Sequence, residues 1–245
     1  MKRIEILGVD GMPEVNPGDD LGGLISSRAT LEPGDVVVVA QKVVSKSEGR
    51  FRHLATVIPS AEAVRLASHL IATPDPRVVQ VILDESVRVV RTERVLITET
   101  RNGYVCANGG VDHSNIPGSD VVTLLPEDPD ASADRVRTRI RDVSGVEVGV
   151  IVSDTFGRPW RMGIVNVALG VAGLPALVDL RGHTDDTGKE LHATVLAIAD
   201  DVASAAGLVM GKTERTPVVI VRGLELRGNG RGTDLIRPAA EDLFR

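Results

Sequence analysis

The sequence is poor in cysteine and in aromatic residues. Its one cysteine, Cys106, excludes an intramolecular disulfide and a zinc site built from several cysteines. Aromatic residues make up only 2% of the chain, so the core must consist of Val, Leu, Ile and Ala, and the stacking platforms of single-strand nucleic-acid binders are lacking. The segment 104–107 has the pattern of a strand interior, which predicts that Cys106 is a small buried thiol.

The chain also lacks an excess of positive charge and any long apolar run. Its formal net charge is −6, whereas proteins that bind the nucleic-acid backbone normally carry a basic face. No apolar run approaches the roughly 20 residues of a membrane span, and no charged-then-apolar signal segment stands at the N-terminus. We therefore expect a cytoplasmic protein with neither a nucleic-acid nor a membrane partner.

Strand-like and helix-like segments alternate irregularly along the 245 residues. The apolar patterns predict strands at 4–7, 36–39, 89–100, 104–107, 146–152 and 216–221, a short helix around 21–25, and helices at 60–70, 77–86, 133–143 and 191–210. Ser60 and Ser132 are expected to cap the helices at 60–70 and 133–143, and Asn102-Gly103 predicts a hairpin. This order favours a mixed α+β fold, and without a repeat or a linker we expect one unit over residues 1–245.

Several familiar catalytic motifs are absent. Gly211-Lys-Thr213 suggests a phosphate-binding P-loop, but Ala206 stands where that motif needs a glycine, and the segment follows a predicted helix. The five histidines show no metal-ligand spacing, and no G-x-S-x-G serine nucleophile motif is present. A P-loop enzyme, a histidine-based zinc enzyme and an α/β-type serine hydrolase are therefore not supported.

Acidic and polar residues follow two of the predicted strands, at Asp112 to Asn115 and at Asp154 and Thr155. Oxygen ligands of this kind suit Mg²⁺ or Mn²⁺, which complete their shell with water and phosphate oxygens. Lys46, expected on a third loop at a strand end, and Arg158 or Arg161 are candidates for neutralising phosphates. Carboxylates in glycine-containing loops are also common turn formers, so the residues alone leave both interpretations open.

Five segments, 17–21, 43–49, 108–115, 153–158 and 216–222, occur in an order that resembles the coenzyme F420-0:L-glutamate ligase family. The resemblance extends over essentially the whole chain. It implies a GTP-dependent ligase that adds L-glutamate through γ-linkages to the lactyl-phosphate arm of a deazaflavin, coenzyme F420-0. It also implies an α+β fold of mixed sheets with flanking helices, in which two interleaved subdomains form an intertwined homodimer.

The same resemblance implies roles for individual residues. Catalytic roles fall to Lys46, Asp112 and Asp154, and the ligands of Mg²⁺ or Mn²⁺ would be Asp112, Asp154 and Thr155. Residues implied to contact GTP are Asp10, Gly11, Met12, Pro13, Gln41, Lys46, Asn115, Met210, Gly211, Lys212, Thr213 and Glu214. A monovalent cation is a further candidate cofactor.

Two positions depart from relatives in the family. Lys212 stands where certain relatives have an acidic or amide side chain, which makes Glu214 the candidate replacement as a metal ligand. Gln41 replaces a hydroxyl residue seen in others. Two other functions keep the same residues: a metal-dependent nucleotide phosphohydrolase, and a non-catalytic module that binds a nucleotide.

Overall fold

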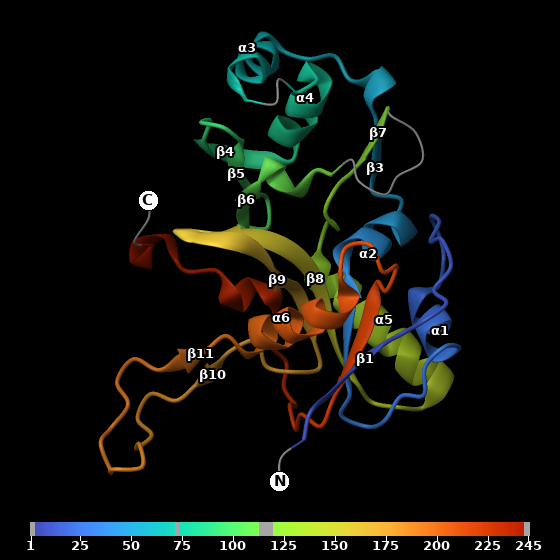
Figure 1. The fold of residues 1–245 in the computed structure, drawn as a ribbon, viewed down its shortest axis with the longest axis vertical. Helices are drawn as coiled ribbons and strands as arrows, with labels where there is room; N and C mark the ends of the chain where they lie inside the picture. Colours follow the sequence, from blue (N-terminus) through green and yellow to red (C-terminus); the bar gives the residue numbers. More distant parts are fainter. Residues whose placement is uncertain (1–2, 72–73, 113–119, 243–245) are drawn as a thin grey trace.

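The computed structural model describes residues 3–71, 74–112 and 120–242. It shows the expected mixed α+β architecture, with one five-stranded sheet, three smaller sheets and helices packed around them (Figure 1). Within these residues no helix is long and apolar enough to cross a bilayer.

The largest sheet has the strand order β1, β12, β2, β8, β9. These strands span Glu5–Gly8 (β1), Val218–Arg222 (β12), Val36–Ala40 (β2), Gly149–Arg158 (β8) and Arg161–Ala172 (β9). The β2 and β8 strands are parallel and the other neighbouring pairs are antiparallel. Val36 to Val39 are all buried, because helices cover both faces of the sheet at this place.

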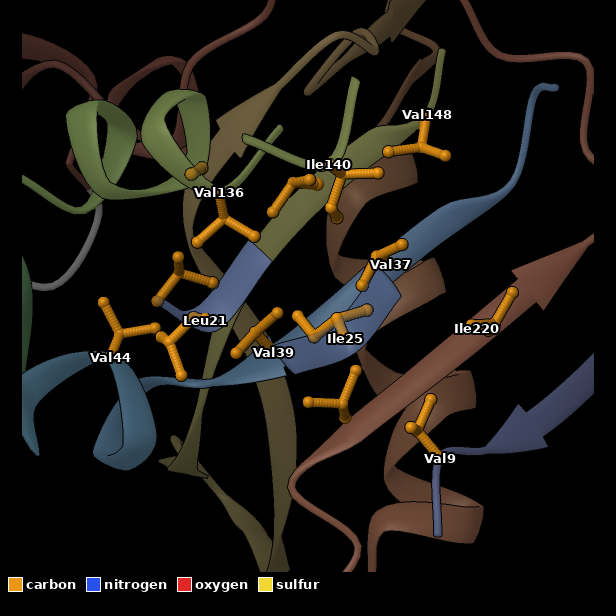
Figure 2. Packing of buried hydrophobic residues seen from close by; sticks show 14 of the residues in the cluster. Val9, Leu21, Ile25, Val37, Val39, Val44, Val136, Ile140, Val148 and Ile220 are labelled. Atoms are coloured by element: carbon orange, nitrogen blue, oxygen red, sulfur yellow. The ribbon is translucent and has the colours of Figure 1, made fainter. Parts of the chain in front are cut away.

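Alternate side chains of β2 enter two different cores. Val37 and Val39 pack with residues of α1 (Leu21–Ser26) and α5 (Pro129–Ser144), among them Ile25 and Ile140 (Figure 2). Val36 and Val38 point the other way, toward α6 (Ile198–Met210). The period of two residues in a strand thus builds a three-layer arrangement of helix, sheet and helix.

The described residues between 51 and 124 (51–71, 74–112 and 120–124) build a second region, drawn at the top of Figure 1, with its own apolar core. Its helices are α3 (Ala61–His69) and α4 (Pro76–Asp84), and its strands are β3 (Phe51–His53), β4 (Ser86–Arg91), β5 (Ile97–Thr100), β6 (Val105–Ala107) and β7 (Val121–Thr123). The β3 and β7 strands pair antiparallel near the border with the first region. The β4, β5 and β6 strands form a separate antiparallel sheet.

The remaining elements are short. A helix, α2 (Gln41–Ser47), follows β2 directly, and β10 (Val178–Asp179) pairs with β11 (Val195–Leu196) at the base of an arm that extends away from the body (Figure 1). Four 3₁₀ helices span Leu54–Thr56, Asn108–Gly110, Gly232–Leu235 and Ala239–Glu241.

Two local predictions are confirmed. The Ser60 hydroxyl accepts a hydrogen bond from the Ala63 amide at 3.2 Å and caps α3. The Asn102-Gly103 turn joins β5 to β6, with Gly103 at a φ of 85° that suits glycine.

The prediction that residues 146–152 form a strand is confirmed in part, but the prediction that a polar loop follows at residue 153 is wrong. The strand β8 continues through Asp154 and Thr155 to Arg158, and the turn comes only at Pro159 and Trp160. Polar side chains do not end this strand, because β9 pairs with its backbone along the whole length. Asp154 and Thr155 therefore lie on a strand of a sheet.

The prediction that Lys46 lies on a loop is also wrong. Residues 41–47 form the helix α2, in which Gln41, Val44 and Ser45 face inward at helical spacing. The Ser45 hydroxyl donates to Gln41 Oε1 at 2.9 Å, so polar residues take part in the buried face of this helix. Because part of the buried face is polar, the spacing of the apolar residues alone does not reveal the helix.

Three other boundaries differ from the predictions. The predicted strand 89–100 is two strands, because Arg94 adopts a φ of 70° in the turn between β4 and β5. The predicted helix 191–210 begins only at Ile198, where Asp200 and Asp201 in the first turn complement the helix dipole. Helix α5 is capped by Asp128, whose carboxylate accepts the Ala131 amide at 3.0 Å, and not by Ser132.

Candidate functional site

A cavity of about 980 Å³ opens where the parallel pairing of β2 with β8 ends, at Ala40 and Ser153. Strand β2 stops there and α2 follows it, whereas β8 continues, so Asp154 and Thr155 reach the cavity from within a strand. The lining residues come from the chain before α1, from the end of β2 with α2, from Asp112 beside β7, from β8 and β9, and from the end of α6 with the segment after it. They are Met12, Pro13, Glu14, Val15, Ala40, Gln41, Lys42, Val43, Lys46, Asp112, Ser153, Asp154, Thr155, Asn166, Met210, Gly211, Lys212, Thr213, Arg215, Thr216 and Pro217.

The two predicted metal-ligand carboxylates, Asp112 and Asp154, both lie in the cavity wall. The Asp112 backbone pairs with Thr123, at 2.9 and 3.1 Å, and its Oδ2 accepts a hydrogen bond from Lys42 Nζ at 2.6 Å. Burial raises the pKa of Asp154, and the nearby negative charge of Asp112 adds to the rise. A buried carboxylate beside a second one is stabilised by a bound cation.

The Thr155 hydroxyl is held by two neighbours. It donates to Asn166 Oδ1 at 3.1 Å, across the register pair that these two residues form between β8 and β9. It accepts a hydrogen bond from Lys212 Nζ. Asn166 was not predicted from the sequence, although one polar side chain inside the apolar run 164–172 is a signal that could have found it.

Lys46 is buried in the cavity wall, and its Nζ pairs with the carboxylate of Glu14, which is largely exposed. Lys42 lies four residues earlier on the same helix, so the two lysines project from neighbouring turns toward one cavity. Lys42 was not predicted either, because the helix that places it beside Lys46 was not recognised in the sequence. Two ammonium groups on α2 and the two predicted ligand carboxylates thus line the same cavity, with Lys42 in contact with Asp112.

The segment after α6 is fixed by its own side chain. The Glu214 carboxylate accepts the amides of Lys212 and Thr213, both at 2.8 Å, and these bonds lower its pKa. Gly211 has a φ of 56°, which other residues rarely adopt, and a Cβ atom there would lie 1.8 Å from Glu214 Oε2 and displace that carboxylate. Glu214 therefore stabilises the loop that contains it. It is not among the residues of the cavity wall, whereas Met210 to Thr213 are.

The other candidate residues lie outside the cavity wall. Asp10 and Gly11 are exposed just before Met12, and Gly11 O accepts a hydrogen bond from Arg28 Nε at 2.8 Å. Arg158 donates to Met162 O at 2.8 Å at the tip of the β8–β9 hairpin, and neither it nor Arg161 lines the cavity. Asn115 lies outside the residues that the structure describes.

Cys106 is buried, as predicted, and burial raises the pKa of its thiol to about 12. The thiolate that a cysteine nucleophile needs is therefore almost absent at neutral pH.

The donor atoms in the cavity fit a hard divalent cation. Asp112, Asp154 and Thr155 offer only oxygen, and the buried Ser153 hydroxyl next to them has no hydrogen-bond partner in the part of the chain that the structure describes. Among the described residues no group of three or more His, Cys, Asp or Glu side chains gathers around one point. Such a site suits Mg²⁺ or Mn²⁺, which use one or two protein carboxylates and complete their shell with water or phosphate oxygens.

The fold and the cavity define a class of protein: a mixed α+β chain whose strand-end cavity carries paired carboxylates and several lysines, the chemistry that suits a phosphorylated ligand. A family model described as F420-0:Gamma-glutamyl ligase matches residues 11–223. The chain therefore belongs to the F420-0:gamma-glutamyl ligase family, which confirms the resemblance seen in the sequence.

Individual relatives agree over their full length. The chain is 49% identical to the coenzyme F420:L-glutamate ligase of Methanopyrus kandleri, covering 100% of both chains. It is 44% identical to the protein of the same name from Methanocaldococcus jannaschii, covering 100% of this chain and 98% of the relative. The Haloarcula marismortui protein of that name is also 44% identical, with 99% and 96% covered.

Proposed function

We propose that this protein is a ligase that joins L-glutamate to coenzyme F420-0 through a γ-glutamyl amide bond, with GTP as the energy source and Mg²⁺ or Mn²⁺ as the metal. The observation that carries the proposal is that Asp112, Lys46 and the pair Asp154 and Thr155, from three separate segments, all line one cavity. Membership of the ligase family and the names of the full-length relatives support the reaction and the substrates.

The chemistry follows from the poor reactivity of a carboxylate toward an amine. The γ-phosphoryl group of GTP passes to a carboxylate oxygen of F420-0, which gives an acyl phosphate and GDP. The glutamate amine then attacks the acyl carbon, loses its proton to the surrounding groups, and phosphate leaves. Phosphoryl transfer requires mainly positioning and charge neutralisation, since little other chemistry falls to the protein.

The cavity residues divide these tasks. Lys42 and Lys46 on α2 bring two positive charges to the phosphates, and Lys46 exchanges Glu14 for a phosphate oxygen when the nucleotide binds. Residues 10–13, Gln41, Asn115 and 210–214 form the rest of the nucleotide contact. A divalent ion between Asp112 and Asp154 would offset negative charge on the transferring group. A monovalent cation stays a further candidate.

The proposed enzyme acts as a homodimer. Met162 and Ile164, at the tip and on the outer strand of the β8–β9 hairpin, are 95% and 59% exposed, and β9 is an edge strand of its sheet. An exposed apolar edge of this kind favours pairing with another chain. The occupant we propose is the same hairpin of a second copy.

Phosphate release tests the reaction class. The protein is incubated with GTP and Mn²⁺, with and without F420-0 and L-glutamate, and free phosphate is measured. A ligase releases phosphate only when both acceptors are present. Release without them would identify a nucleotide phosphohydrolase, and nucleotide binding without release in any mixture would identify a non-catalytic module; either result rejects the proposal.

A further inference from the structure

The ammonium group of Lys212 lies inside the cavity, on the hydroxyl of Thr155. That hydroxyl gives its one proton to Asn166 Oδ1 at 3.1 Å and accepts from Lys212 on a lone pair. A hydroxyl has one donor and two acceptor positions, so a single lone pair remains for any other ligand. Lys42 binds one oxygen of Asp112 in a similar way, but a carboxylate has a second oxygen, whereas the Thr155 side chain has only the one that Lys212 contacts.

The backbone of Lys212 is held in place. It follows Gly211, whose φ of 56° and ψ of −160° turn the chain sharply at the end of α6. Its amide donates to Glu214 Oε2 at 2.8 Å, within the compact loop that Glu214 closes. The side chain therefore starts from a fixed point at the cavity wall, and its stem needs only to extend to reach Thr155.

The charge of Lys212 also reaches the neighbouring carboxylate. Burial raises the pKa of Asp154, and the positive charge of Lys212 opposes that rise. Lys42 performs the equivalent task for Asp112, at 2.6 Å. Each of the two acids thus has a lysine nearby, and Lys212 approaches Asp154 from the side of Thr155.

A divalent ion bound to Thr155 would stand close to this ammonium group. Oxygen ligands lie about 2.0–2.6 Å from Mg²⁺ or Ca²⁺, and the ammonium is already in hydrogen-bond contact with the same oxygen. Like charges at such a separation repel each other, and more strongly beside a protein wall than in bulk water. The ammonium and a divalent ion on Thr155 are therefore alternatives.

We propose that Lys212 is a built-in cation of this site: its ammonium takes the position at Thr155, contacts the nucleotide phosphates there, and leaves room for one divalent ion, held by Asp112 and Asp154. The inference rests on the proposed function only in taking a nucleoside triphosphate as the ligand. It assigns to Thr155 the role of positioning Lys212, in place of the predicted role as a metal ligand.

The number of bound metal ions tests this inference. Mn²⁺ is titrated into the full-length protein in the presence of a non-hydrolysable GTP analogue, and unbound Mn²⁺ is measured by electron paramagnetic resonance, with the analogue alone as the blank. The wild type is expected to bind one Mn²⁺ per chain beyond the blank. Lys212→Gln removes the charge and adds an amide oxygen, so it is expected to bind a second, weaker Mn²⁺.

Two variants control for the substitution itself. Lys212→Arg keeps the positive charge and is expected to bind one Mn²⁺. Lys189→Gln makes the same chemical change on the exposed arm and is also expected to bind one. Circular dichroism confirms that each variant is folded before the titration.

Other counts would overturn the inference. A wild type that binds two ions per chain, or none, contradicts it, and so does a folded Lys212→Gln variant that still binds one. Ligation of glutamate to F420-0 is measured separately on the same preparations. If the wild type binds one Mn²⁺ per chain but does not ligate glutamate, the proposed function is wrong and the inference stands. If it ligates glutamate but binds two Mn²⁺ per chain, the inference is wrong and the proposed function stands.

Discussion

Asp154 is an acidic residue at a position where the empty fold favours an uncharged side chain. Its half-buried carboxylate comes directly after the buried stretch of β8, burial raises its pKa, and a second carboxylate lies nearby. Taking a charged group out of water costs free energy unless a cation compensates. The placement is therefore unfavourable for the empty fold and favourable for a cation-bound one.

Replacing Asp154 separates these two effects. Asp154→Asn is expected to lower ligation at least about 100-fold, the scale for losing one electrostatic group at a reacting centre. Thermal unfolding of the metal-free variant is expected at an equal or higher temperature than that of the wild type, because an amide needs no charge compensation. Asp186→Asn on the exposed arm is the matched control, and wild-type-like ligation by Asp154→Asn would reject the assignment.

Lys46 is paired with Glu14, which a nucleotide would have to displace if it binds as proposed. Its ammonium pairs with Glu14, which is 67% exposed, and exposed ion pairs contribute about 0.2–1 kcal/mol. Glu14→Gln is therefore expected to tighten GTP binding by up to about fivefold, as measured by isothermal titration calorimetry. Glu62→Gln on α3 serves as the control, and weaker binding by Glu14→Gln would show that Glu14 contacts the nucleotide favourably.

At the scale of elements, the segment after α6 depends on one glycine. Gly211 has a φ of 56° and a ψ of −160°, a region that costs other residues about 1–3 kcal/mol. A Cβ atom there would also meet Glu214 Oε2 at 1.8 Å. The loop that places Lys212 in the cavity therefore depends on Gly211 having no side chain.

Gly211→Ala is expected to displace this loop. GTP affinity should fall by about tenfold or more, which corresponds to about 1.4 kcal/mol, and denaturant unfolding should show a loss of about 1–3 kcal/mol. Gly157→Ala is the matched control, because Gly157 has no positive φ and a Cβ atom added to it would meet no described atom within 4 Å. Unchanged affinity in Gly211→Ala would remove this loop from the nucleotide site.

Elements with a clear apolar period were predictable from the sequence. Strand β2 is an unbroken run of valines, and α3 combines a serine cap with an apolar face, so both were located within a residue or two. Helix α2 was missed because its buried face includes Gln41 and Ser45, and the polar end of β8 was missed because strand pairing, and not side-chain polarity, sets its length. Pairing and polar burial depend on tertiary contacts that a local pattern does not contain.

The candidate site shows the same limit. The predicted carboxylates, Thr155 and Lys46 do line one cavity, although Asp154 and Thr155 lie within β8 and Lys46 lies on α2, and none of the three lies on the predicted loops. Lys42 and Asn166 became visible only when the helix and the β8–β9 register were known. The sequence also could not show that Glu214 closes its own loop, because that depends on the backbone turn at Gly211.

At the scale of the whole molecule, the β8–β9 hairpin is the candidate contact with a second copy. Met162→Lys places a charge on the exposed apolar tip and is expected to convert a dimer into a monomer, because an interface would bury that charge unpaired; light scattering coupled to size-exclusion chromatography measures the change. Ile58→Lys is the matched control on the second region, where the side chain is 89% exposed. A dimer that persists in Met162→Lys would place the interface elsewhere, and a monomeric wild type would reject the dimer.

The whole molecule also explains why the cavity lies where it does. The parallel pair β2 and β8 ends at one edge of the sheet, and the segments before α1 and after α6 close over that edge. The second region contributes Asp112 from beside β7. Ligand binding in a cavity assembled from so many segments would stabilise the whole chain.

Mass spectrometry of the coenzyme product tests the central claim most directly. F420-0 is incubated with the protein, GTP, L-glutamate and Mn²⁺, and the deazaflavin fraction is analysed by its mass and fragmentation. The account predicts a product heavier by one or more glutamyl residues, joined through the γ-carboxyl, with GDP formed in proportion and no product in Asp154→Asn. An unchanged deazaflavin mass with the folded wild-type protein would contradict it.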